Sequence, residues 1–92
     1  MLHLTLRQLK VFESVARNLS YSRAADELHL TQPAVSMQIK QLEDNISLPL
    51  FEHLGKRIYL TEAGRELYQY SRAISQQLAD MEVALDELKG ME

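Results

Sequence analysis

The chain has 92 residues, 46% hydrophobic and 25% charged, which is typical of one folded domain and excludes a disordered segment. It has no cysteine, no signal-peptide pattern at its start and no apolar run near the ~20 residues of a membrane span, so we expect a cytoplasmic protein without disulfides or a membrane partner. The net charge of −3 is uneven: residues 1–61 hold seven basic against six acidic side chains and residues 62–92 hold three against seven, which permits nucleic-acid binding in the first part without predicting it.

The first predicted element is a helix over residues 6–18. Thr5 and Gln8 have the spacing of a capping box, in which each side chain bonds the backbone of the other residue. The apolar residues recur at helical spacing and form one stripe, made of Leu6, Leu9, Phe12, Val15, Ala16 and Leu19. Arg7 lies off that stripe, on the solvent side of the predicted helix.

Two further helices are predicted with only a short turn between them. The first covers residues 21–29, with Ser20 as its cap and paired small residues, Ala24 and Ala25, turned inward. The second begins after Thr31 and ends near residue 45. Its apolar stripe is Val35, Ile39, Leu42 and Ile46, and it has Pro33 in its first turn, where the missing amide costs nothing.

A small β-hairpin follows Pro49. Two runs rich in β-forming residues, 50–54 and 57–61, are separated by Gly55 and Lys56. The tip around Gly55, Lys56 and Arg57 is the most basic part of the chain, although a solvated turn with no binding role has the same composition.

The last predicted element is a long helix over residues 62–89, capped by Thr61 and stopped by Gly90. Its apolar residues advance by alternating steps of three and four, interrupted only by Ser71, which is the repeat of a coiled-coil seam. We expect this seam to be a dimer interface, made of Leu67, Ile74, Leu78, Met81, Leu85 and Leu88. The alternative is that the stripe packs within the subunit.

This order of elements predicts a mainly α fold: a winged helix-turn-helix of three helices and a short β-hairpin wing, followed by a long linker helix for dimerisation. We expect residues 1–61 to form the DNA-binding domain and residues 62–92 the linker helix. Three short amphipathic helices also occur in bundles with no role in DNA binding, so the hairpin and the seam are needed to favour the winged interpretation.

The third helix carries side chains suited to reading DNA in the major groove. Gln32 matches adenine, Lys40 matches guanine or a phosphate, and Ser36 matches a base or a phosphate. Pro33, Ala34 and Met37 suit contact with thymine methyl groups, and Arg7 suits a phosphate. Lys56 and Arg57 suit an adjacent minor groove.

No residue pattern indicates catalysis. The three histidines, His3, His29 and His53, are too far apart for a helical ligand pair, and no carboxylate pair, Ser/His/Asp set or glycine-rich phosphate loop is present. We therefore expect neither an enzyme nor a bound metal or cofactor.

Over residues 4–89 the sequence resembles the DNA-binding domain of LysR-type transcriptional regulators. The most specific segments are Thr31-Gln32-Pro33-Ala34-Val35-Ser36 and Leu60-Thr61-Glu62-Ala63-Gly64, together with Ala24-Ala25, Leu28, Gln38-Ile39, Leu42-Glu43 and Leu50-Phe51. The segments around Met37 and over Phe51–Ile58 are most similar to regulators of carbon-fixation (RuBisCO) operons.

The resemblance implies a longer regulator with a C-terminal effector-binding domain that this chain lacks. Such regulators dimerise through the linker helix, usually form tetramers, and bind an interrupted dyad operator in double-stranded DNA. By position, Thr31 would cap the recognition helix, Gln32, Pro33, Ser36 and Met37 would face bases, Arg7 the backbone, and the wing with His53 the minor groove.

Two positions depart from the pattern of the family. Many members have arginine where this chain has Met37 and His53. Met37 replaces a charged contact by an apolar one, which should favour thymine, and His53 leaves the cationic work of the wing to Lys56 and Arg57. The competing hypotheses are a winged helix used for contact between proteins, which suits the low net charge, and a DNA-binding regulator of another winged family.

Overall fold

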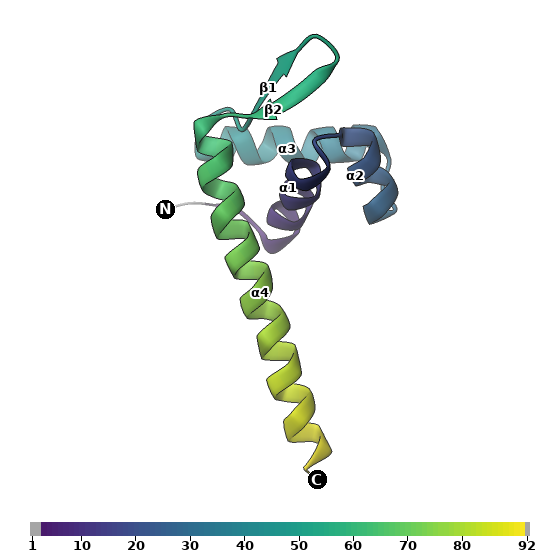
Figure 1. Cartoon of the computed structure of the whole chain (residues 1–92), viewed down its shortest axis with the longest axis vertical. Helices are drawn as coiled ribbons and strands as arrows, with labels where there is room; N and C mark the ends of the chain where they lie inside the picture. The colour runs from purple at the N-terminus through teal and green to yellow at the C-terminus, as the bar shows by residue number, and fades with distance from the viewer. Residues whose placement is uncertain (1–2, 92) are drawn as a thin grey trace.

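A computed structural model describes residues 3–91 of the chain, so residues 1–2 and 92 of the expected domain ranges lie outside it. The described part has four helices and two strands: α1 (Leu6–Asn18), α2 (Tyr21–Leu28), α3 (Gln32–Ile46), β1 (Phe51–Leu54), β2 (Arg57–Leu60) and α4 (Glu62–Gly90). Figure 1 shows α1, α2, α3 and the hairpin gathered at one end, with α4 leaving them as a long arm. The predicted fold, a mainly α winged helix-turn-helix with a long final helix, is confirmed.

The core lies between α1, α2, α3 and the inner face of the hairpin. It consists of Val11, Phe12, Val15, Ala16, Ala24, Ala25, Val35, Ile39, Leu42, Leu50, Phe51 and Ile58. The predicted stripe of α1 was wrong at both ends, because Leu6 and Leu19 are exposed. Leu6 stands at the open first turn of the helix, and Leu19 has the left-handed backbone of a C-cap, which takes its side chain off the helical stripe.

The turn between α2 and α3 is made by backbone bonds. His29 ends α2 in a left-handed conformation with φ 56°, one residue earlier than predicted. Its amide donates to the carbonyl of Asp26 at 3.3 Å, and the amide of Leu30 donates to the carbonyl of Ala25 at 2.9 Å. These bonds satisfy carbonyl groups at the end of α2 and reverse the chain direction, so that α3 begins after a short turn.

The hairpin is an antiparallel pair with Phe51 opposite Leu60 and His53 opposite Ile58. Gly55 takes φ +63° at its tip, a conformation that side chains rarely adopt. Leu50 and Thr61, predicted as strand residues, lie just outside the strands and join the base of the hairpin instead, where the amide of Thr61 donates to the carbonyl of Leu50 at 3.0 Å.

The first turn of α4 is fixed against this base. The Thr61 hydroxyl accepts from the amide of Gly64 at 3.0 Å and donates to the carbonyl of Pro49 at 2.7 Å. A Cβ at Gly64 would overlap the carbonyl oxygen of Leu50 and lie 2.9 Å from Cδ2 of Leu60. Only glycine therefore allows α4 to begin so close to the backbone of the hairpin base.

The first part of α4 packs on the core and the remainder does not. Ala63, Leu67 and Tyr68 are partly buried against the core, and Ser71 is buried, with its hydroxyl donating to the carbonyl of Tyr68 at 2.9 Å. From residue 72 to 91 every side chain except the half-buried Leu78 is exposed. Packing against the core thus continues into the first turns of α4 as far as Tyr68, and Ser71 is the last buried residue of the helix.

α4 ends at Gly90, within one residue of the predicted end. Gly90 does not take the positive φ of a glycine that follows a helix, and the C-cap is Met91 in a right-handed conformation. An added Cβ at Gly90 would meet nothing within 4 Å, so no close approach explains this glycine.

Gly64→Ala should destabilise the fold by about 1–3 kcal/mol or more, because the new methyl group overlaps a backbone oxygen that cannot turn aside. Thermal unfolding followed by circular dichroism measures the loss. Gly90→Ala is the control: it places the same methyl group in open space and should leave the midpoint unchanged or raise it slightly. Equal midpoints for the two variants would show that the contact at Gly64 does not constrain the fold.

Candidate nucleic-acid interface

The outer face of α3 is exposed along the first half of the helix. The Thr31 hydroxyl accepts from the amide of Ala34 at 3.2 Å and caps the helix, while Val35, Ile39 and Leu42 anchor the opposite face in the core. The residues left in solvent are Gln32, Pro33, Ser36, Met37 and Lys40. Ala34 is half-buried, so it has less surface to offer than the other predicted base contacts.

Met37 is the one large apolar side chain of α3 that is exposed, with 54% of its surface in solvent. It lies between Ser36 and Lys40 on the outer face and belongs to no packed cluster. An apolar side chain held out among polar ones is suited to a partner that mixes hydrogen-bonding groups with methyl groups, as base edges in the major groove do.

A polar network of side chains joins α1 to α2. The hydroxyl of Ser14, which is buried, donates to a carboxylate oxygen of Glu27 at 2.5 Å, and Arg17 donates to the same oxygen and to Glu13. The bonds from Arg17 and Ser14 lower the pKa of Glu27 to about 2. Sequence reasoning missed this network, because Glu13 and Glu27 look like solvated residues of two separate helices.

The hairpin stands out from the helical body beyond α3 (Figure 1). Lys56 and Arg57 at its tip are exposed, as predicted for a cationic wing. His53 lies differently from the expectation of a free wing contact, because its ring stacks on the ring of Tyr21 from α2. Burial, with the charge of Glu43, raises the pKa of Tyr21 to about 12, so this phenol stays neutral. Tyr21 was not predicted, although an aromatic residue directly after a cap is a visible signal.

Arg7 lies with α4 and not with the outer face of α3. Together with Leu6 and Lys10 it lines a hollow between α1 and the middle of α4, whose other walls include Leu78 and Glu82. The structure therefore does not bring Arg7 together with the other predicted DNA-contacting residues. The part it would play at a phosphate stays a prediction without support from its position.

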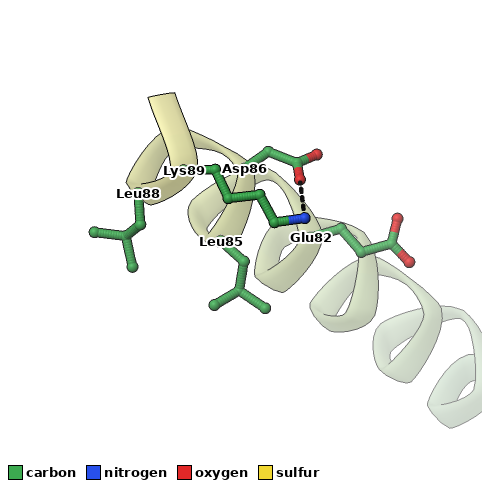
Figure 2. A pocket seen from close by; sticks show the side chains of 5 residues that line it. All are labelled: Glu82, Leu85, Asp86, Leu88 and Lys89. Carbon is green, nitrogen blue, oxygen red and sulfur yellow. Dashed lines mark ion pairs between the residues drawn. The ribbon is translucent and has the colours of Figure 1, made fainter. Parts of the chain in front are cut away.

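The outer part of α4 carries the predicted seam. Ile74, Met81, Leu85 and Leu88 are exposed, whereas Leu67 is used by the core of its own subunit. Figure 2 shows Leu85 and Leu88 projecting from one side of the helix, with Glu82 and the ion pair Asp86–Lys89 turned away from them. The hollow that these five residues line is the surface of a single helix, so it has no opposite wall to enclose a small molecule.

Other classes of site find no support in residues 3–91. No group of three or more His, Asp or Glu side chains in this part of the chain is placed to hold a metal ion. None of its helices is long and apolar enough to cross a membrane.

Comparison of the sequence with known families matches residues 6–65 to bacterial regulatory helix-turn-helix proteins of the lysR family. The RuBisCO operon transcriptional regulator of Allochromatium vinosum is 66% identical over 90 residues, which is 98% of this chain and 30% of that protein. The HTH-type transcriptional regulator CbbR of Rhodospirillum rubrum is 53% identical over 85 residues, 92% of this chain and 28% of that protein. The chain thus spans less than a third of the length of these relatives, which are transcriptional regulators.

Solved structures with the same fold include two complexes with DNA. The BenM_DBD/catB site 1 DNA complex matches with a TM-score of 0.88 and 29% identity, covering 92% of this chain and 96% of that one. The CbnR_DBD–DNA complex matches with a TM-score of 0.80 and 31% identity, covering 95% and 99%. In both cases the likeness extends over more than nine-tenths of this chain.

Because the pKa of Glu27 is lowered in the folded chain, its carboxylate stabilises the fold above the ordinary pKa of 4.5, and this contribution is lost as the pH falls toward 2. Glu27→Gln should therefore weaken the dependence of thermal stability on pH between about 4.5 and 2. Glu52→Gln, at an exposed carboxylate of the hairpin that forms no ion pair among the described residues, is the control. If both variants kept the wild-type pH profile, the network would not join α1 to α2 energetically.

Proposed function

The chain belongs to the lysR family of bacterial regulatory helix-turn-helix proteins, and from that premise we propose that it is the N-terminal, sequence-specific DNA-binding part of a transcriptional regulator. The observation that carries the proposal is the outer face of α3, where base-reading side chains are exposed while the opposite face is anchored in the core. The exposed side chains of α3 support a DNA-binding module of this kind and not an enzyme.

Recognition falls to the first three turns of α3 in the major groove. Gln32 pairs with adenine, Ser36 and Lys40 bond a base or a phosphate, and Pro33 and Met37 contact thymine methyl groups. Thr31 acts through its cap, which holds the first turn in place. Because Val35, Ile39 and Leu42 are buried, the helix cannot turn about its axis, so each of these side chains keeps its place relative to the groove.

The hairpin tip binds a neighbouring minor groove with Lys56 and Arg57. Narrow A·T stretches of that groove have an enhanced negative potential, which attracts cations. The left-handed Gly55 closes the tip without a side chain, so the two cations stand at its end. These contacts add affinity and register, while the base contacts of α3 supply most of the specificity.

Two chains associate through the exposed seam of α4 and present two copies of α3 to an interrupted dyad. Ile74, Met81, Leu85 and Leu88 lie exposed on one side of the arm, and Leu78 on the same side is half-buried beside α1. Burial of such a stripe against a second copy is the usual outcome for a 3.5-residue repeat in water. We take residues 72–91 as the dimerisation arm and the part before it, through Ser71, as the DNA-binding domain.

The names of the relatives suggest the role of the whole protein. Regulators of RuBisCO operons are similar to this chain over nearly all of its length, so we propose a carbon-fixation operon as the target. The remaining length of such a regulator would hold an effector-binding domain and support a tetramer. Binding to the bacterial chromosome gives it a cytoplasmic location.

Fluorescence anisotropy with duplexes from the promoter of a carbon-fixation operon tests the proposal. The chain should bind with a steep loss of affinity as salt rises, because cations released from phosphates drive binding. Gln32→Ala should weaken binding to the operator by about 1–3 kcal/mol, and Gln69→Ala, at an exposed glutamine on α4, should not. A dimeric chain that binds no duplex at micromolar concentration and low salt would favour a module for contact between proteins.

Leu85→Asp should convert the dimer to a monomer, measured by light scattering, because it places a charge within the apolar seam. Val83→Asp is the matched control, since Val83 is 57% exposed and Leu85 50%, but Val83 lies on the far side of the helix. Both variants should keep their helical content, because neither side chain packs on the core. A Leu85→Asp variant that stayed dimeric would rule out the seam as the interface.

A further inference from the structure

We propose that the stack of His53 on Tyr21 is the joint that sets the position of the hairpin relative to α2 and α3, so that His53 is a positioning residue and not a DNA contact. The inference rests on the proposed DNA-binding function. The position of His53 in the wing suggests a minor-groove contact, whereas the inference gives it the role of orienting the hairpin.

The stack is the outer end of a row of rings that starts in the core. The ring centroids of Phe12 and Phe51 are 5.5 Å apart, and those of Phe51 and Tyr21 are 5.9 Å apart. The rings of Tyr21 and His53 follow at 6.1 Å with only 9° between their planes. Aromatic pairs prefer such tilted, edge-on and offset parallel arrangements. The row links α1, β1 and α2 through side chains alone.

The register of the hairpin places His53 on its inner face. Phe51 and His53 are two residues apart on β1 and therefore point to the same side, and their partners on β2 are Leu60 and Ile58. Phe51 and Ile58 are buried in the core, so this side faces the helices. The stack on Tyr21 lies on the same side, and it directs the imidazole toward α2.

His53 is the last position along β1 at which the hairpin contacts a helix through a ring. Leu54, the next residue, is 62% exposed, and Gly55, Lys56 and Arg57 are exposed as well. A two-stranded hairpin has little stability of its own, so its direction depends on contacts of its inner face. The base is held by Phe51 and Ile58, and the stack adds a second support nearer the tip.

Contacts at the base alone would let the hairpin pivot relative to the helices. The second contact, between His53 and Tyr21, restricts that pivoting. Tyr21 follows the cap of α2, and α2 is joined to α3 by the short turn at His29 and Leu30. The stack therefore relates the cations of the tip to the outer face of α3. Loss of the stack would remove no side chain that contacts the DNA. It would leave the distance between the hairpin tip and the outer face of α3 unfixed, so a duplex that contacts both would bind less well.

The test compares His53→Ala with His53→Phe in the full dimeric chain. His53→Phe keeps a flat ring against Tyr21 but has no group that can bond DNA, so it should bind the operator like the wild type. His53→Ala should bind a few-fold to about tenfold more weakly, the range that an aromatic pair contributes. Hydroxyl-radical footprinting should show that His53→Ala loses protection of the minor groove flanking the site while protection around the α3 contacts remains.

Two results would overturn the positioning role. If His53→Phe bound the operator as weakly as His53→Ala, the ring would not be enough and His53 would be a direct DNA contact. If His53→Ala bound like the wild type, the stack would carry no consequence for binding. Thermal unfolding accompanies both variants: His53→Phe should keep the wild-type midpoint, and His53→Ala should lower it only slightly, because one exposed ring contact is lost.

A measurement without DNA separates failure of this inference from failure of the proposed function. In the free chain the ring current of Tyr21 should shift the His53 ring protons upfield in NMR spectra, and Tyr21→Leu should abolish the shift. If the His53 ring protons of the wild type are not shifted upfield, the stack does not form in solution and the inference fails. If the His53 ring protons are shifted but the chain binds no DNA, the stack exists and the proposed DNA-binding function is wrong.

Discussion

The first turn of α4 lies against the carbonyl of Leu50 so closely that no side chain fits between them, and three parts of the molecule depend on that approach. The amide of Leu50 donates to the carboxylate of Glu43 on α3, and its carbonyl accepts from Thr61 at the end of the hairpin. One residue thus joins the end of α3, the base of the hairpin and the start of α4. The direction of the arm and that of the wing follow from the same few bonds.

The elements could be predicted from the sequence wherever a local pattern decides them. Thr5, Thr31 and Thr61 each cap a helix as their spacing indicates, because a cap needs only neighbouring residues. The end of α4 was predicted to within one residue, but the left-handed turn expected of Gly90 is absent, because Met91 caps the helix in a right-handed conformation. Leu67 fits the repeat of the seam as well as Ile74 does, and only the fold shows that the core already uses it.

The candidate site was predictable on α3 and at the hairpin tip, but not in the contacts that hold them. Exposure of Gln32 and Met37 follows from the helical period once the opposite stripe is known. The bond between Ser14 and Glu27 joins residues 13 positions apart, and the Tyr21–His53 stack joins residues on two elements. Such pairs depend on the angle at which elements pack, and no local pattern records that angle.

The uneven charge of the chain has a further consequence. Residues 62–92 carry four more acidic than basic side chains, whereas residues 1–61 carry one more basic than acidic. The acidic arm would be repelled by a polyanionic duplex, whereas the nearly neutral remainder of the chain would not. The molecule therefore has an electrostatic polarity along its 56 Å length. In the proposed complex with DNA, that polarity would turn the arm away from the phosphates, which would leave its apolar stripe free for a second copy and orient α3 before any base is touched.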